Sequence, residues 1–179
     1  MQDLNFAYLG KNVLISPFAR FYGTENISIG DNSRIDDFCI ISAKQPVTIG
    51  RYVHIAPFCG LYGVYGIEIH DYCGISSNVA IYSGSDDYSG EFMNNPTIPM
   101  EFRRIDSGKV ILEKQVSIGC GCVIFPNVKI NKGSTVMAMS LVAKNIPESS
   151  IVGGIPARFI KHRSTRLFEL EKLLEAMDE

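Results

Sequence analysis

The segment Ile81–Gly90, with the sequence IYSGSDDYSG, concentrates side chains that could take part in chemistry. It carries two adjacent carboxylates, Asp86 and Asp87, and three serine hydroxyls, but no histidine. Carboxylates attract an ammonium group, orient it through charge-assisted hydrogen bonds and can accept a proton from it. Acids beside glycine and serine are also typical of a turn. The segment therefore indicates an acidic binding site or a structural turn, depending on the elements that hold it.

A repeat of six residues runs along the chain on both sides of this segment. A period of six fits neither an isolated helix nor a simple alternating strand. Short strands joined by corners, three to a coil, account for it, and stacked coils bury each other's faces. The large aliphatic residues of the repeat are expected to stack in the middle of the coils. They are Ile29, Ile35, Ile41, Ile49, Ile55, Leu61, Ile69, Ile75, Ile81, Leu112, Ile118, Ile124, Ile130, Val136 and Val142.

Small residues occupy most of the positions four places after these aliphatic residues, as Ser33, Cys39 and Val53 do. We expect them to fill tighter inward-facing slots, and glycines to serve corners that need unusual backbone angles. Cys39, Cys59, Cys73 and Cys122 fall in these slots and are expected to be buried thiols, whereas Cys120 falls outside them. The repeat thus predicts an all-β fold, a parallel β-helix.

Composition and charge argue against several classes of protein. The 179 residues are 46% hydrophobic, enough for one packed domain, and the net charge of −2 argues against a general nucleic-acid-binding protein. No apolar run approaches the roughly 18 residues of a membrane span, and no secretory signal is visible. Five cysteines in such a chain predict reduced thiols and a cytoplasmic location. The cysteine and histidine spacings do not indicate a metal site.

The repeat is interrupted by a loop over residues 82–109. A loop this long in a compact domain is usually functional or disordered, and its aromatic residues and prolines argue against a loose linker. Residues 1–24 keep the period poorly and are expected to cap the open end of the coils. The predicted β-helix domain therefore covers residues 1–162 and includes the loop.

The last residues, 163–179, follow an amphipathic helical pattern. Leu167, Leu170, Leu174 and Met177 lie on one face of this helix and charged residues lie elsewhere. We expect the apolar face to pack against the coils or against another subunit.

The repeat, the interrupting loop, the last coils and the closing segment IVGGIPAR (151–158) together resemble the hexapeptide-repeat acyltransferases, and more narrowly the sugar O- and N-acetyltransferases. The resemblance covers about residues 25–162. It implies a left-handed parallel β-helix, a homotrimer with active sites between subunits, and acetyl-CoA as acyl donor without a metal. It also implies that the loop covers the acceptor. The residues expected to bind the acceptor are Tyr82, Ser83, Ser85, Tyr88 and Glu91.

Contacts with acetyl-CoA can be assigned by the resemblance only where the family's motifs match. The coil Val116–Gly121 matches the coil whose backbone lines the pantetheine channel, and a small residue follows at 138, although methionines flank it. Basic residues in and after the segment LVAKNIP match positions near the nucleotide end, where they would attract phosphate groups. The residues assigned to acetyl-CoA are Gly119, Cys120, Ala138, Lys144, Arg158 and Lys161.

The family's O-acetyltransferases place a histidine near the start of the loop, where it deprotonates the sugar hydroxyl, and here that histidine is absent. An alcohol needs a base to attack a thioester, whereas a neutral amine attacks unaided and needs orientation and a proton acceptor. Asp86 and Asp87 therefore favour an amino sugar, expected to be nucleotide-linked and used in surface polysaccharide (O-antigen or capsule) synthesis, as the acceptor. Either Asp86 or Asp87 would bind or deprotonate the amine. Both acids could instead be turn residues beside glycine and serine.

Three alternatives remain open at this point. His54, on an outward position of an early coil, could act as the base of an O-acetyltransferase, and it is a better candidate than His70. A zinc enzyme similar to γ-carbonic anhydrases would need His54, His70 and His162 to converge on one metal. A non-catalytic scaffold would not bind acetyl-CoA.

Overall fold

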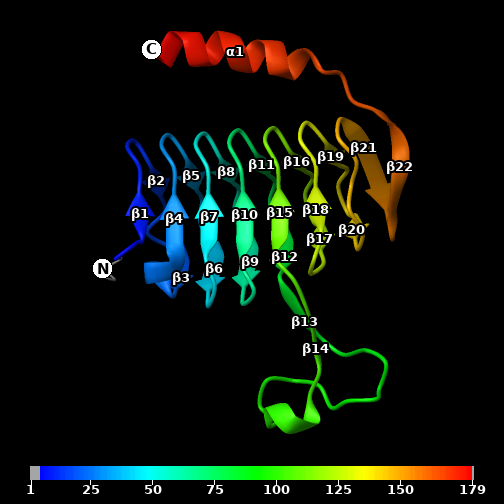
Figure 1. Cartoon of the computed structure of the whole chain (residues 1–179). Coiled ribbons are helices and arrows are strands. Elements are labelled where there is room, and N and C mark those ends of the chain that lie inside the picture. The colour runs from blue at the N-terminus through cyan, green and yellow to red at the C-terminus, as the bar shows by residue number, and fades with distance from the viewer. Residues whose placement is uncertain (1–4, 179) are drawn as a thin grey trace.

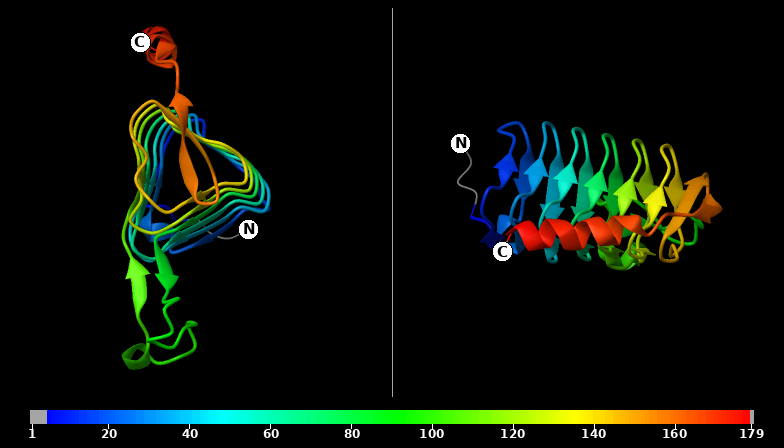
Figure 2. Two further views of the ribbon diagram at one scale, coloured as in Figure 1. Left: turned by 90° about the vertical axis from the view of Figure 1, so that its right-hand side faces the viewer. Right: turned by 90° about the horizontal axis from the view of Figure 1, so that it is seen from above.

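The computed structural model of the protein describes residues 5–178, which form a left-handed solenoid of stacked coils with a triangular cross-section (Figures 1 and 2). Its three faces are parallel sheets of six, eight and six strands, although the eight-stranded sheet ends in one antiparallel pair. The first sheet consists of β1 (Tyr8–Leu9), β4 (Ile27–Ile29), β7 (Val47–Ile49), β10 (Ile67–Ile69), β15 (Val110–Leu112) and β18 (Lys129–Ile130).

The other two faces continue each coil around the prism. The second sheet consists of β2 (Leu14–Ile15), β5 (Arg34–Ile35), β8 (His54–Ile55), β11 (Gly74–Ile75), β16 (Ser117–Ile118), β19 (Thr135–Val136), β21 (Ser150–Gly154) and β22 (Ala157–His162). The third consists of β3 (Arg20–Tyr22), β6 (Ile40–Ala43), β9 (Gly60–Gly63), β12 (Ala80–Tyr82), β17 (Val123–Ile124) and β20 (Leu141–Val142).

The core confirms the register that the six-residue repeat predicts. All fifteen aliphatic residues of the predicted stack are at most 3% exposed. The small slots are buried as well, including those of Cys39, Cys59, Cys73 and Cys122, whereas Cys120 is exposed. Because the coils stack in register, equivalent residues of successive coils pair directly, as Ile35 does with Ile55 and Ile75 with Ile118.

Glycine does not serve the corners in the way the sequence indicates. Most residues with a left-handed backbone are not glycine, and they include Asn32, Phe38 and Tyr72. Gly30 and Gly50 lack a positive φ, and a Cβ on either would lie 2.4–2.6 Å from atoms of the next coil. The expectation of unusual angles at these glycines was wrong, because close stacking of the coils is what excludes a side chain there.

The N-terminal segment keeps the repeat better than its sequence indicates. Leu9, Ile15 and Phe21 pair with Ile29, Ile35 and Ile41, each twenty residues further on. The poor period expected for residues 1–24 was therefore wrong over these strands, which form a terminal coil in register with the next. Residues 1–4 and 179 lie outside the described part of the chain.

The interrupting loop projects from one corner of the solenoid (Figure 1). It leaves and returns through an antiparallel pair, β13 (Gly84–Asp86) and β14 (Ile105–Ser107), and contains one 3₁₀ turn, η2 (Met100–Phe102). A second 3₁₀ turn, η1 (Thr24–Asn26), joins the first two coils. The hairpin holds the loop at the corner between the third sheet, from which β12 leads into it, and the first sheet, in which β15 follows it.

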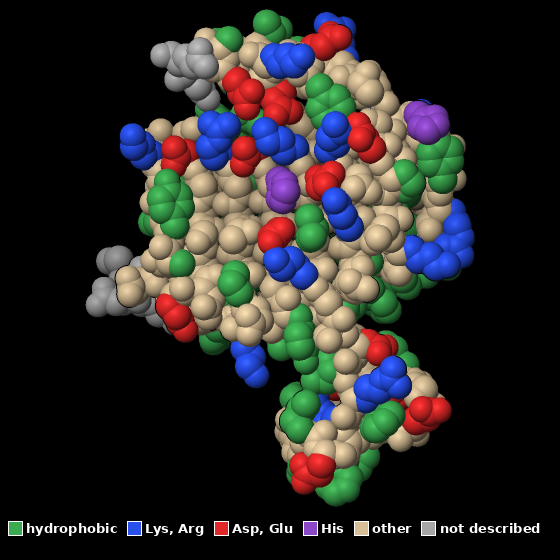
Figure 3. All heavy atoms as spheres, in the orientation of Figure 1, with side chains coloured by type: hydrophobic (Ala, Val, Ile, Leu, Met, Phe, Trp, Pro, Cys, Tyr) green, Lys and Arg blue, Asp and Glu red, His purple; other side chains and the backbone are tan. Residues whose placement is uncertain are grey.

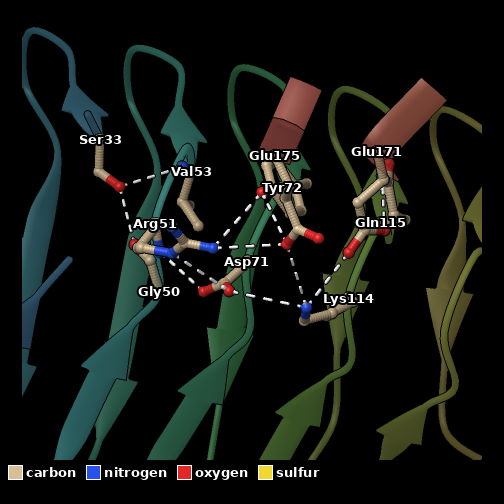
Figure 4. A network of polar contacts seen from close by, with 10 residues as sticks. All are labelled: Ser33, Gly50, Arg51, Val53, Asp71, Tyr72, Lys114, Gln115, Glu171 and Glu175. Carbon is tan, nitrogen blue, oxygen red and sulfur yellow. Dashed lines mark hydrogen bonds and ion pairs between the residues drawn. The ribbon is translucent and has the colours of Figure 1, made fainter. Parts of the chain in front are cut away.

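The C-terminal helix α1 (Arg166–Asp178) runs back along one edge of the solenoid (Figure 2), and a band of acidic and basic side chains follows this junction (Figure 3). Glu171 accepts hydrogen bonds from Lys114 and Gln115, and Glu175 pairs with Arg51 and accepts one from Tyr72 (Figure 4). The polar side of the helix thus faces the coils.

The expectation that the apolar face of the helix packs against the coils of its own chain was therefore wrong, and its packing against another subunit stays a prediction. Leu170 is 53% exposed and Met177 is 83% exposed. Basic residues at the corners of successive coils attract the glutamates of the helix, so the acidic side of the helix faces the coils. Among the described residues, no helix is long and apolar enough to cross a membrane.

Candidate active site

A cavity of about 540 Å³ lies where the projecting loop meets the third sheet. Tyr82 on β12 and Val123 at the start of β17 form its floor, and the loop supplies the opposite wall. The hairpin β13–β14 holds this wall in place because it pairs both ends of the loop. The cavity is lined by Tyr82, Gly84, Ser85, Asp86, Tyr88, Asn94, Asn95, Val123 and Phe125.

Asp86 presents its carboxylate at this cavity. Its Oδ1 lies 2.8 Å from Nη2 of Arg103, and its Oδ2 accepts a hydrogen bond of 3.2 Å from the backbone N–H of Asn95. The hydrogen bond from Arg103, aided by that of Asn95, lowers the pKa of Asp86 below the ordinary aspartate value. The group is therefore an oriented, ionised carboxylate with lone pairs left for a further donor.

Asp87 has a different environment from its neighbour. It is 6% exposed, and its carboxylate accepts hydrogen bonds from the hydroxyl and N–H of Ser89 and from the N–H of Gly90. The hydrogen bond from Ser89 is the main cause that lowers the pKa of Asp87. This geometry is that of an aspartate that closes a turn.

The other loop residues predicted to bind the acceptor fall into two groups. Tyr82, Ser85 and Tyr88 line the cavity, and Ser85 and Tyr88 also border an adjoining one of about 300 Å³. Ser83 is 0% exposed; its hydroxyl donates to the carbonyl of Tyr62 and accepts from the N–H of Tyr65. Glu91 is exposed and is absent from the linings of these two cavities.

A groove of about 440 Å³ runs across the second sheet, on another face of the prism. His54 borders it, and Nε2 of His54 lies 2.8 Å from Oδ2 of Asp36. The other carboxylate oxygen of Asp36, Oδ1, lies 2.5 Å from Nε of Arg34. Burial acts to raise the pKa of Asp36, but the hydrogen bonds from His54 and Arg34 outweigh it, so that pKa is lowered. The groove is lined by His54, Ala56, Gly74, Ile75, Ser76, Ser77, Ser117, Ile118, Gly119, Thr135, Val136 and Met137.

Three of the residues assigned to acetyl-CoA gather at the end of this groove. Gly119 lines it, and a Cβ on Gly119 would lie 2.4 Å from the backbone nitrogen of Ala138. The carbonyl of Cys120, the next residue, accepts a hydrogen bond of 2.8 Å from the N–H of Met139. The two segments that the sequence assigns to pantetheine therefore form adjoining corners of successive coils.

The basic residues assigned to the nucleotide end lie further along the solenoid. Lys144 and Arg158 border one small cavity of about 180 Å³ near the end of the coils, and Arg158 donates a hydrogen bond to the carbonyl of Ala157. Lys161 lies on β22 opposite Ile151 of β21 and is exposed. Lys144 and Arg158 are brought together, whereas Lys161 is not part of that lining.

Several lining residues cannot be found by inspection of the repeat alone. Arg103 is separated from Asp86 by most of the loop in sequence. Asn94 and Phe125 are distant in sequence and come to line the same cavity only in the folded chain. Gly74 and Ser76 occupy outward positions of the repeat, where the pattern tolerates many residue types. Within residues 5–178, no group of three or more histidine, cysteine and acidic residues is arranged to hold a metal ion.

Comparison with known proteins places this geometry in a family, although no family model matches the chain. An Escherichia coli protein described as dTDP-4-amino-4,6-dideoxy-D-glucose acyltransferase is 43% identical over 176 residues, which cover 98% of this chain and 92% of that protein. A second relative, described as the putative lipopolysaccharide biosynthesis O-acetyl transferase WbbJ of E. coli K12, is 30% identical over 83% of this chain and 67% of its own length.

Solved structures agree. AntD, an N-acyltransferase from Bacillus cereus, superposes with a TM-score of 0.93 at 46% identity, over 97% of this chain and 93% of its own, in a complex with dTDP and 3-hydroxybutyryl-CoA. A serine variant of AntD has been solved with dTDP-4-amino-4,6-dideoxyglucose and coenzyme A. On its near full-length similarity to these proteins and on its coil architecture, the chain is an acyltransferase of the hexapeptide-repeat, left-handed β-helix family, in the branch that acylates sugars.

Proposed function

We propose that the enzyme transfers an acetyl group from acetyl-CoA to the amino group of a dTDP-linked amino sugar. The observation that carries the proposal is the oriented carboxylate of Asp86 at a cavity beside the coils, where a histidine base is absent. The full-length similarity to a dTDP-amino-sugar acyltransferase and to AntD supports the same acceptor class.

The chemistry of an amine explains the use of an acid at this position. Asp86 attracts the substrate ammonium, orients the amine and accepts a hydrogen bond from it while the nitrogen attacks the thioester carbonyl. The ammonium first releases one proton to water, which leaves a neutral amine. The C–N bond then forms, the C–S bond breaks, and the leaving thiolate of coenzyme A takes up the second proton that the nitrogen loses, so that the products are the amide and the free thiol. The lowered pKa of Asp86 suits the orienting role better than that of a strong base.

The AntD structures support the choice of candidates. They include variants of one serine and of one aspartate ten positions further along. This chain carries a serine and an aspartate at the same spacing twice, as Ser76 with Asp86 and as Ser77 with Asp87. Of the two acids, Asp86 carries the proposed catalytic role, because the carboxylate of Asp87 is engaged by its own turn.

The acyl donor is proposed to lie along the groove of the second sheet. Gly119, Cys120 and Ala138 would border its pantetheine arm, and Lys144, Arg158 and Lys161 would attract its phosphate groups. Because the groove and the acceptor cavity lie on different faces of one chain, we propose a homotrimer in which the loop of one subunit meets the groove of the next. The free thiols of all five cysteines support a cytoplasmic location, and WbbJ's description supports a role in surface polysaccharide synthesis.

The proposal is tested by detecting the free thiol released from acetyl-CoA in the presence of dTDP-4-amino-4,6-dideoxyglucose or of its 4-hydroxyl counterpart. Turnover with the amino sugar alone supports N-acylation. Turnover with the hydroxyl sugar alone contradicts it. The second outcome would favour O-acetylation with His54 as base, a candidate supported by its 2.8 Å contact with Asp36 and by the similarity to WbbJ.

A further inference from the structure

Gly74 has no role in the fold that accounts for a glycine. It lies on β11, within the second sheet, where glycine is disfavoured because it adds no packing and costs backbone entropy. Its φ is not positive, and a Cβ built on it would meet no atom within 4 Å. Among the sixteen glycines of the chain, all of them in the described part, Gly74 alone combines an ordinary backbone with open space.

Gly119, in the same groove, shows the contrast. A Cβ on Gly119 would lie 2.4 Å from a backbone atom of the next coil, so the fold itself requires that glycine. Glycine in a strand without such a constraint marks a place where something outside the strand approaches the backbone closely.

The neighbours of Gly74 define a notch across the sheet. Among the outward-facing residues of the second sheet, Gly74 pairs with His54 on the neighbouring strand β8 and with Ser117 on the neighbouring strand β16. Two residues further along these strands, the small residues Ala56 and Ser76 also line the groove. The floor of the groove is therefore lowest at Gly74, between the bulky His54 and the predicted pantetheine corner at Gly119.

The chemistry of the lining points to an uncharged occupant. No lysine or arginine lines this groove, so it is poorly suited to the diphosphate of a nucleotide sugar or of coenzyme A. Ser76 and Ser77 line it, and within residues 5–178 their hydroxyls make no side-chain hydrogen bond, so both could donate to a carbonyl oxygen. A thioester and its short acyl chain have these properties.

We propose that the missing side chain at Gly74 makes room for the acyl group of the thioester, so that position 74 sets the size of the acyl group that the enzyme accepts. The inference rests on the proposed function, since it takes acyl-CoA as the ligand of this groove. Gly74 is a specificity-determining residue and takes no part in bond making or breaking.

Gly74→Ala and Gly74→Val test this directly. A Cβ at position 74 has no heavy atom of the described chain within 4 Å, so there is space for the added side chain. We expect both variants to fold, with a melting temperature that is unchanged or raised by up to about 4 °C. Calorimetric binding of CoA, acetyl-CoA and butyryl-CoA is then compared. CoA should bind all forms equally, whereas butyryl-CoA should bind Gly74→Ala about 10-fold and Gly74→Val about 100-fold more weakly than wild type. In each variant the affinity for acetyl-CoA should fall less than the affinity for butyryl-CoA.

Ser28→Val is the matched control, because Ser28 lies at an outward strand position of the first sheet, away from the groove. It should leave all three affinities unchanged. The inference is overturned if CoA and both acyl-CoAs weaken equally, if no affinity changes, or if Gly74→Val only alters the oligomeric state in analytical ultracentrifugation, since Gly74 would then face pantetheine, nothing or another subunit.

Steady-state transfer to the amino sugar separates this inference from the proposed function. Suppose that wild type and the Gly74 variants differ in acyl-CoA affinity as expected, but wild type transfers nothing to an amino sugar. The proposed acceptor is then wrong, and the proposed role of Gly74 is still supported. If wild type transfers acetyl but the Gly74 variants keep the wild-type ratio of kcat/KM for butyryl-CoA and acetyl-CoA, the notch is wrong and the acceptor stands.

Discussion

Arg103 and Asp86 lie seventeen residues apart in sequence, yet Nη2 of one is 2.8 Å from Oδ1 of the other. The side chain of Arg103 is only 8% exposed, and its Nε is buried without a hydrogen-bond partner in the described structure. The guanidinium thus joins the two ends of the loop and fixes the carboxylate at the acceptor cavity. A buried cation of this kind depends on its anion, because an unpaired buried charge is destabilising.

Replacing Asp86 should therefore affect activity and stability separately. We expect Asp86→Asn to lower kcat on the order of 100-fold, since the amine loses its charged acceptor, and to lower the melting temperature, since Arg103 loses its counterion. The double variant Asp86→Asn with Arg103→Gln should recover the melting temperature but not kcat. Recovery of both, measured by calorimetry and by thiol release, would show that Asp86 is only a structural partner of Arg103.

The pH dependence of this pair has a defined sign. Because Arg103 lowers the pKa of Asp86, the pair stabilises the fold fully at pH values above the unfolded aspartate pKa of about 3.9 and loses this contribution as the pH falls through the lowered pKa. The difference in melting temperature between wild type and Asp86→Asn should be constant above about pH 5 and shrink in more acidic solution. A difference that grows on acidification would contradict the assignment.

Asp87 should behave as a structural residue of the loop. We expect Asp87→Ala to release the turn at Ser89 and Gly90 and to speed amide hydrogen exchange in this segment, because three donors lose their common acceptor. The KM for the amino sugar should rise while the affinity for CoA stays unchanged. Exchange at wild-type rate combined with a loss of kcat as large as that of Asp86→Asn would instead give Asp87 the catalytic role.

His54 distinguishes the two reaction types. Under N-acylation we expect His54→Gln to reduce kcat/KM for the amino sugar less than 10-fold, because the amine needs no strong base. Asp36→Asn, which removes the partner of His54, should have an effect of similar size. A loss of more than 100-fold in both variants, with Asp86→Asn nearly unaffected in the same thiol-release assay, would establish His54 as the base.

The junction between α1 and the coils predicts an unusual tyrosine. Burial, with Glu175 nearby, raises the pKa of Tyr72 to about 12, so its contribution to stability is lost as the pH rises from about 10 through about 12. Glu175→Gln should lower this pKa in an ultraviolet titration, with Tyr72→Phe identifying the signal. The unfolding free energy at pH 7 should change by no more than about 1 kcal/mol, because the ion pair of Glu175 with Arg51 is partly exposed. An unchanged tyrosine titration would mean that α1 does not lie on this edge in solution.

The solenoid and its register follow from the six-residue period. A side chain such as Ile55 must stack between Ile35 and Ile75 because a six-residue period leaves the same inward position on every coil. The position of the loop, where the period is interrupted, and the burial of four cysteines follow from the same period. These features depend on local spacing, which the order of residues contains.

The difference between the two acids and the open space at Gly74 depend on contacts that form only in the folded chain. Adjacent carboxylates in one segment acquire different roles because Arg103 reaches Asp86 across the loop while Ser89 closes the turn on Asp87. The glycine at 74 can be recognised as unconstrained only when the next coils are in place around it. Such features arise from contacts between residues far apart in the chain, and a periodic sequence specifies which strand is the neighbour but not which side chain meets another across a loop or a groove.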